Sequence, residues 1–74
     1  MLQARRPQLL DLVAVLKSPI DLDLTIGDVG TVVEVLPPDG VMVEFLDREG
    51  RTRCLATLPV DAVLTLNRER TLVR

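Results

Sequence analysis

The sequence predicts an all-β fold, namely a small five-stranded barrel with one 3₁₀ turn before the last strand. Glycine and proline divide the 74 residues into short pieces, which is typical of strands joined by turns. The pieces are rich in valine and leucine, and apolar residues make up 47% of the chain. Because little else is present to cover five short strands, we expect the sheet to close and bury one face of each strand.

The first predicted strand covers about residues 11–16. Leu9, Leu12, Val13 and Leu16 also fit one stripe of a helix, so the apolar run alone leaves both conformations open. The run ends at residues 18–19 in either case, since the residue before a proline disfavours the helical region. The shortness of the run favours a strand.

A long loop over residues 17–28 leads into the second strand, expected at 31–36. Gly27 and Gly30 are predicted to close the turn with positive φ angles. The strand that follows is rich in β-branched residues. The segment 37–40, with sequence PPDG, is predicted to be a hairpin turn with its glycine in the left-handed region.

The third and fourth strands are expected at 41–46 and 51–58, joined by the turn sequence DREG. Strict alternation places two sets of side chains in the core, namely Val41, Val43 and Phe45, then Thr52, Cys54, Ala56 and Leu58. A single 3₁₀ turn at 59–62 and a last strand at 63–66 complete the domain. Residues 1–8 are expected to form an N-terminal extension, 9–66 the domain and 67–74 a C-terminal tail.

The order of elements resembles an Src-homology-3-like barrel: a long loop, two tight hairpins and a 3₁₀ turn before the last strand. The stretch GDVGTVVEV at 27–35 also resembles the core of KOW modules. Together with LDLVAVL at 10–16, VEF at 43–45 and TLP at 57–59, it is similar to a family of small bacterial proteins described only as a domain of unknown function. The resemblance implies the fold and assigns no functional residue.

The net charge of −2 is unfavourable for non-specific nucleic-acid binding, which needs a basic surface. Nine acids and two bases fall within residues 11–49, and both ends of the chain are basic. Folding either intermixes these charges in space or separates an acidic face from a basic end. The sequence leaves both arrangements open.

The residue types argue against catalysis. The chain has no His, Tyr or Trp, and one cysteine, Cys54. A zinc site of the usual Cys/His type and an intramolecular disulfide are therefore excluded, and no imidazole is present to activate the thiol. We expect no enzyme, no cofactor, no metal and no small-molecule substrate. A lone unpaired cysteine and the absence of any long apolar run predict a cytoplasmic protein that does not enter a membrane.

An excess of outward-facing aliphatic residues gives the candidate site. If Glu34 and Glu44 mark outward faces, alternation exposes several apolar neighbours on two adjacent strands, and also Leu55. The predicted partner-binding residues are Val32, Glu34, Leu36, Met42, Glu44 and Leu46. The alternative is that strand bulges or the N-terminal segment cover them.

We therefore predict a non-enzymatic protein-binding module, an accessory or inhibitory partner that binds a larger protein or its own copy through these strands. The alternative is a nucleic-acid-associated, KOW-like module. It would use the arginines of the C-terminal half, namely Arg51, Arg53, Arg68, Arg70 and Arg74. That alternative rests on analogy of fold alone.

Overall fold

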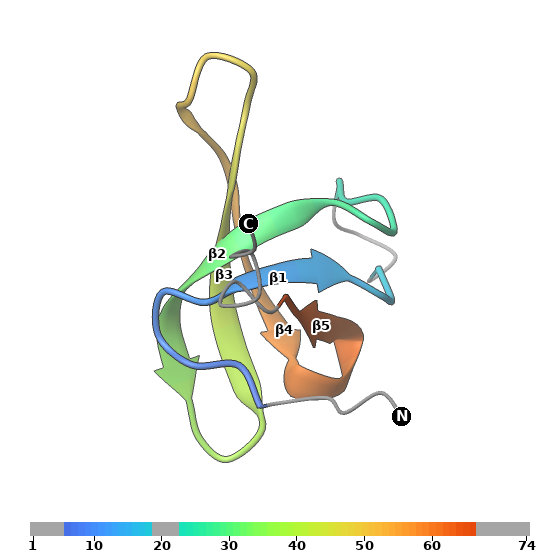
Figure 1. Cartoon of the computed structure of the whole chain (residues 1–74), viewed down its shortest axis with the longest axis vertical. Helices are drawn as coiled ribbons and strands as arrows, with labels where there is room; N and C mark the ends of the chain where they lie inside the picture. Colours follow the sequence, from blue (N-terminus) through green and yellow to red (C-terminus); the bar gives the residue numbers. More distant parts are fainter. Residues whose placement is uncertain (1–5, 19–22, 67–74) are drawn as a thin grey trace, which may run out of the picture.

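A computed structural model describes residues 6–18 and 23–66 and contains five antiparallel strands (Figure 1). They are β1 (Leu12–Val15), β2 (Val29–Leu36), β3 (Gly40–Leu46), β4 (Thr52–Pro59) and β5 (Val63–Thr65). A 3₁₀ helix, η1 (Val60–Ala62), connects β4 to β5. The predicted all-β class, the five strands and the 3₁₀ turn are confirmed. The first apolar run is a strand and not a helix.

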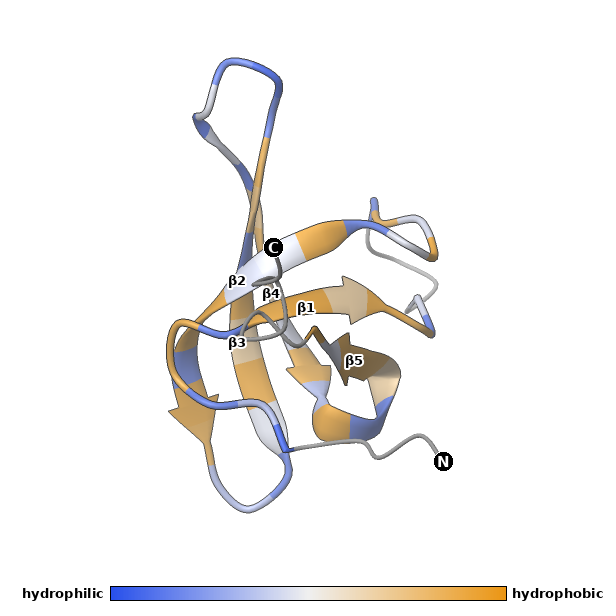
Figure 2. Ribbon diagram, in the orientation of Figure 1, coloured by the Kyte–Doolittle hydropathy of each residue, from blue (hydrophilic) through white to orange (hydrophobic). Residues whose placement is uncertain are grey.

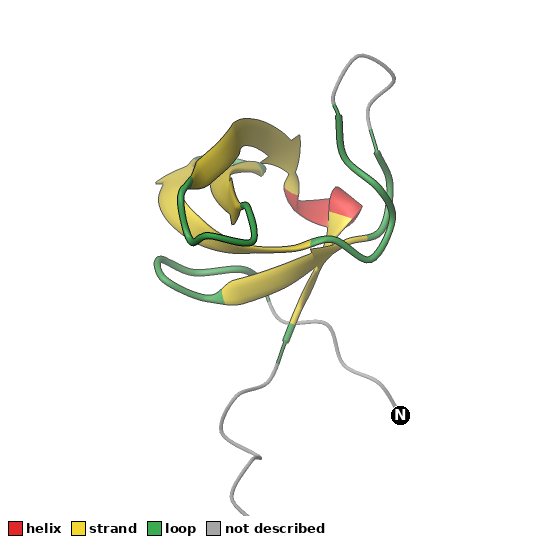
Figure 3. Cartoon of the chain, turned by 90° about the horizontal axis from the view of Figure 1, so that it is seen from above, coloured by secondary structure: helices red, strands yellow, loops and turns green. Residues whose placement is uncertain are grey.

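The five strands form one sheet in the order β4-β3-β2-β1-β5. The sheet curls around its own core when seen from above, and η1 lies between its two ends (Figure 3). β4 and β5 are the edges of this sheet, and no pairing between them closes it within the described residues. Closure into a barrel thus stays a prediction.

The core consists of aliphatic side chains from every strand and one aromatic ring. Hydrophobic residues recur along the strands of the ribbon (Figure 2). Val41, Val43 and Phe45 point inward from β3, as the alternation predicted, and are at most 1% exposed. The other buried residues of the core cluster are Val13, Val15, Leu24, Val32, Ala56, Leu58, Ala62 and Val63. No polar side chain is buried among the described residues, so apolar packing holds the core.

A β-bulge in β2 makes the prediction for Val32 wrong. Val32 is fully buried, although strict alternation with Glu34 placed it on the outside. Val32 pairs with Val43 and Glu34 pairs with Met42, so Val33 is an extra residue between two ladder positions. The extra residue lets Val32 face the core while Glu34 still faces solvent.

A second bulge, in β4, makes the prediction that Thr52 lies in the core wrong. Cys54 pairs with Phe45 and Thr52 pairs with Leu46, which leaves Arg53 unpaired between them. Thr52 is therefore exposed, whereas Ala56 and Leu58 are buried as predicted. Cys54 is half-buried and packs against the core.

Only one of the two glycines in the 27–30 turn has the predicted positive φ angle. Gly27 has φ +96° and closes a turn in which the Asp28 carboxylate accepts the Thr25 N–H at 2.9 Å. Gly30 lies within β2 and has no positive φ. The positive-φ glycines are Gly27 and Gly50, so the left-handed conformation predicted for Gly40 is also wrong.

The β3–β4 hairpin extends beyond the rest of the sheet (Figure 1), and Asp47 stabilises its tip. One carboxylate oxygen of Asp47 accepts the N–H groups of Glu49 and Arg51, each at 2.9 Å. We expect Asp47→Ala to lower the free energy of unfolding by about 1 kcal/mol, because two backbone donors lose their acceptor. Urea denaturation measures this change.

The matched control for Asp47 is Glu49→Ala at the same tip. Glu49 contributes an exposed ion pair to Arg51 at 3.8 Å, so its loss is expected to stay within about 0.5 kcal/mol. Equal losses for the two variants would contradict the capping role of Asp47.

The N-terminal segment packs against the β2–β3 hairpin. The Arg6 guanidinium donates to the Pro38 carbonyl at 2.6 Å and lies 3.8 Å from the Asp39 carboxylate, and Pro7 is buried. The predicted division into residues 1–8, 9–66 and 67–74 stays a prediction, because residues 1–5 and 67–74 lie outside the described residues.

Candidate functional site

The strand register brings most of the predicted site residues together on the outer face, the side of β2, β3 and β4 that points away from the core. Glu44 lies between Thr31 of β2 and Leu55 of β4. One step along the strands, Met42 lies between Glu34 and Thr57. Cross-strand neighbours of this kind have Cβ atoms roughly 5 Å apart and form one continuous surface.

Two leucines are the most exposed apolar groups of this outer face. Leu46 is 53% exposed and Leu55 is 56% exposed, from adjacent strands. Met42 and Leu36 are half-buried, and Glu34 is exposed. Five of the six predicted residues thus face outward, and only Val32 does not. Whether these residues bind a partner stays a prediction.

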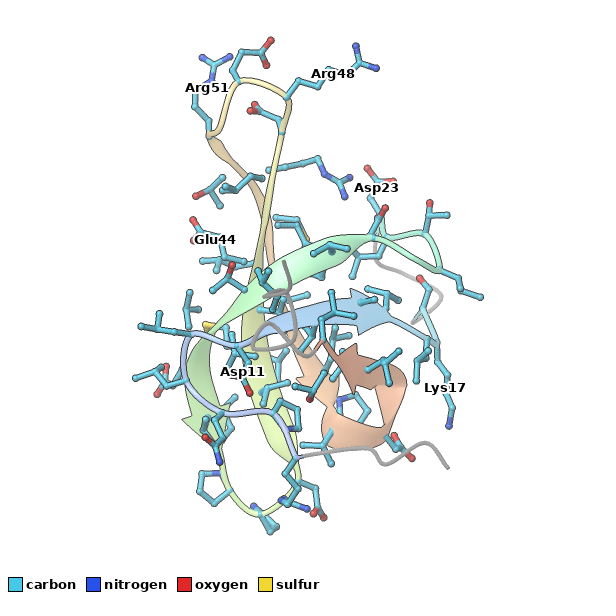
Figure 4. All side chains as sticks on the ribbon, in the orientation of Figure 1. Asp11, Lys17, Asp23, Glu44, Arg48 and Arg51 are labelled. Carbon is cyan, nitrogen blue, oxygen red and sulfur yellow. The ribbon has the colours of Figure 1, made fainter. Side chains whose placement is uncertain are left out.

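The Glu44 carboxylate is fixed between the two leucines. Its Oε2 accepts a hydrogen bond from the Thr52 hydroxyl, which the β4 bulge turns to the outer face. Leu55 pairs with Glu44 across the strands, and Leu46 pairs with Thr52. These pairs bring two leucines, one carboxylate and one hydroxyl together on the outer face. Glu44 lies near the base of the protruding hairpin (Figure 4). Sequence reasoning missed Thr52, because alternation had placed it in the core.

Two arginines that the nucleic-acid alternative would use, Arg51 and Arg53, lie among the described residues, and both contact acidic residues. Arg51 lies at the hairpin tip, 3.7 Å from the Asp47 carboxylate (Figure 4). Arg53 reaches the loop before β2, where it donates to the Asp23 carbonyl at 3.1 Å and to the Asp28 carboxylate at 3.2 Å. Arg68, Arg70 and Arg74 lie outside the described residues.

Acidic and basic residues from distant parts of the sequence pair with one another. Arg6 lies near Asp39, Lys17 lies 3.7 Å from Asp61, and Arg53 binds Asp28. The described residues therefore favour the intermixed arrangement of charge over one acidic face and one basic end. Each pair is exposed or half-exposed and contributes about 0–1 kcal/mol.

A shallow pocket of about 290 Å³ lies beside η1. Its lining is mainly aliphatic, from Pro7, Leu16, Val60 and Leu64, and includes the charged residues Arg6 and Asp61. The lining has no hydroxyl, thiol or imidazole that would act as a nucleophile or base. Across the described part of the chain, no group of three or more Cys, Asp or Glu side chains is placed to hold a metal ion.

The family of the chain follows from comparison with known proteins. Residues 9–69 match the family described as Domain of unknown function (DUF4926). The chain belongs to this family. No curated protein and no solved structure matches the chain.

The DUF4926 match covers all five strands and every residue of the outer face. It confirms the resemblance to a domain of unknown function that the sequence motifs indicated. In this DUF4926 domain, no helix of the described residues is long and apolar enough to cross a membrane.

Proposed function

We propose that this DUF4926 domain is a non-enzymatic protein-binding module of the bacterial cytoplasm, an accessory or inhibitory partner of a larger protein. The observation that carries the proposal is the pair Leu46 and Leu55, each more than half exposed on adjacent strands. Burial of apolar surface contributes about 25 cal/mol per Å², so a partner that covers both leucines gains affinity. The single unpaired Cys54 supports a reducing compartment.

The Glu44 carboxylate supplies specificity in this proposal. It lies between the leucines and is held by Thr52, so a partner that covers the leucines also meets a fixed acceptor. A partner without a donor at that position would bury the negative charge of Glu44 without a compensating group of its own, at a large cost. The partner surface we propose is therefore apolar, with an arginine, a lysine or a backbone N–H opposite Glu44.

We also propose that the curved sheet is a partly open, Src-homology-3-like barrel, in which η1 and not strand pairing connects β4 to β5. The support is the order of the elements: a long connection between β1 and β2, then two tight hairpins, then η1. β5 returns to pair with β1, antiparallel. η1 therefore connects β4, at one edge of the curled sheet, to β5, at the other edge.

The test of the binding proposal replaces Leu46 by aspartate. A charge at this position opposes burial against a partner, so we expect the amount of retained partner to fall about tenfold or more. The measurement is a pull-down with the tagged full chain from nuclease-treated lysate of the source organism, quantified by mass spectrometry. The variant must show wild-type circular dichroism.

The control for Leu46→Asp is Ile26→Asp, the same kind of change at a 67% exposed residue in the loop before β2. We expect Ile26→Asp to retain the same protein as wild type, in the same amount. Equal retention by Leu46→Asp and wild type would remove the outer face from the binding proposal.

A further inference from the structure

We propose that two copies of this chain pair through the edge of β4 with which no described strand pairs, in antiparallel register about a two-fold axis at Ala56. The inference rests on the proposed protein-binding function, because it identifies a second copy of the chain as one of the partners. It uses the edge of β4, whereas a larger protein would use the outer face. The two surfaces share Leu55, and they are tested separately by changes at Thr57 and at Leu46.

The backbone groups that face this edge follow from the hydrogen-bond pattern of β3 and β4. Val60 N–H donates to the Asp39 carbonyl at 2.8 Å, in the same register that pairs Val41 with Leu58. Antiparallel pairs alternate between hydrogen-bonded and non-hydrogen-bonded. Leu55 and Thr57 therefore belong to non-hydrogen-bonded pairs, and their N–H and C=O groups point away from β3 toward the edge.

Pro59 agrees with this assignment. It pairs with Gly40 at a non-hydrogen-bonded position, where a proline loses no bond of the ladder. Pro59 and the bulge at Arg53 also interrupt the two ends of the edge. Between them lies a regular stretch of five residues, 54–58.

This stretch lacks the usual protection against strand pairing. Natural edge strands carry charged side chains or prolines that discourage a second strand. Residues 54–58 are Cys, Leu, Ala, Thr and Leu, with no charge among them. The nearest charge along β4, on Arg53, is bound to Asp28 and the Asp23 carbonyl of its own chain. The Glu44 carboxylate, opposite Leu55 on β3, accepts a hydrogen bond from Thr52. Two copies of the edge therefore approach without like-charge repulsion.

The register is determined by the two interruptions. With the axis at Ala56, Leu55 of each copy lies opposite Thr57 of the other, and all four edge-facing N–H groups meet carbonyls. An axis at Leu55 would pair Thr57 with the bulged Arg53, and an axis at Thr57 would pair Leu55 with Pro59, which has no N–H. Ala56 is small, which suits the close approach of a non-hydrogen-bonded pair on the axis.

The same register joins the two outer faces into one surface. Leu55 and the Leu55 of the second copy become diagonal neighbours across the new pair, within reach of each other. Part of the apolar surface of Leu55, which is 56% exposed in one copy, is then covered. Leu46 lies one strand further in and stays available to a larger protein.

The experiment is sedimentation or light scattering of the full chain over micromolar to millimolar concentration, with Thr57→Pro and the control Thr57→Val. Proline removes an edge-facing N–H but no bond to β3, so we expect the dimer dissociation constant to rise about tenfold or more. Thr57→Val keeps the N–H and is expected to dimerise like wild type. A monomer at millimolar wild-type concentration, or equal dimerisation by all three, would overturn the inference.

Amide hydrogen exchange of the wild-type chain gives an independent answer if Thr57→Pro does not fold. The Leu55 and Thr57 amides should become protected as concentration rises, while amides of the loop before β2 should not change. Absence of that protection in a dimer would place the contact elsewhere. Leu46→Asp leaves the edge intact, so it should dimerise normally even where it loses a larger partner.

Discussion

Gly30→Ala is expected to lower the free energy of unfolding by about 3 kcal/mol, because the added methyl group has no space. A Cβ at Gly30 would lie 2.6 Å from Val43 Cγ1, 2.7 Å from the Glu44 carbonyl oxygen and 2.9 Å from Phe45 Cδ1. A side chain can rotate away from such a contact, but the Glu44 carbonyl is part of β3 and pairs within the sheet. The strands must therefore separate locally.

The total stability of a chain of this length is roughly 4–11 kcal/mol, so this loss removes from about a quarter to about three quarters of it. Urea denaturation followed by circular dichroism measures it. Gly40→Ala is the control, since its nearest neighbour is the Leu36 carbonyl oxygen at 3.4 Å and its φ is not positive. We expect Gly40→Ala to change stability by less than about 1 kcal/mol. A small effect at both glycines would contradict the close approach of β2 and β3 at Gly30.

The strands themselves could be predicted from the sequence because their signals are local. Proline, glycine and aspartate mark each turn, and the inward set Val41, Val43 and Phe45 follows from a period of two. The predicted strand at 41–46 differs from β3 by one residue. The DUF4926 match over residues 9–69 agrees with the motifs that carried the resemblance.

The errors in the predicted site come from the two bulges. The extra residue Val33 directs the side chain of Val32 toward the core. The extra residue Arg53 directs the side chain of Thr52 toward solvent. A bulge shifts the phase of alternation without any glycine or proline to mark it, so a strict period of two cannot locate it. The exposed leucines Leu46 and Leu55 were found because each lies on an uninterrupted stretch that also carries a core residue of known direction.

The role of Gly30 was also out of reach of the sequence. A glycine in the stretch GDVG fits a turn with positive φ, and Gly27 has that backbone. Gly30 is required for a different reason, the approach of β3, which depends on long-range register. Likewise, Arg53 and Asp28 are 25 positions apart in the sequence. Their hydrogen bond therefore becomes evident only from the folded structure.

Phe45→Ala is expected to destabilise the domain by about 3–5 kcal/mol, as other buried phenylalanine truncations do. Phe45 is the single aromatic residue of the chain, is 1% exposed and is the largest fully buried side chain. The remaining core is Val, Leu and Ala, and none of these can extend to fill the space of a ring. The loss is measured by urea denaturation, with Leu55→Ala as control. Leu55 is 56% exposed, so its truncation should cost less than about 1 kcal/mol, and equal losses would show that Phe45 does not fill the core.

The Gly30 and Phe45 predictions are physically linked, because the ring edge of Phe45 occupies the space that a side chain at Gly30 would need. Phe45→Leu shortens that edge and still fills part of the core. If the ring contact dominates the cost of Gly30→Ala, the double variant Gly30→Ala/Phe45→Leu loses less stability than the two single losses added together. If the Glu44 carbonyl contact dominates, the losses add, since no side-chain change moves the backbone of β3. We expect losses that are less than additive, because one of the three close contacts is removed, yet larger than for Phe45→Leu alone, because the carbonyl at 2.7 Å remains.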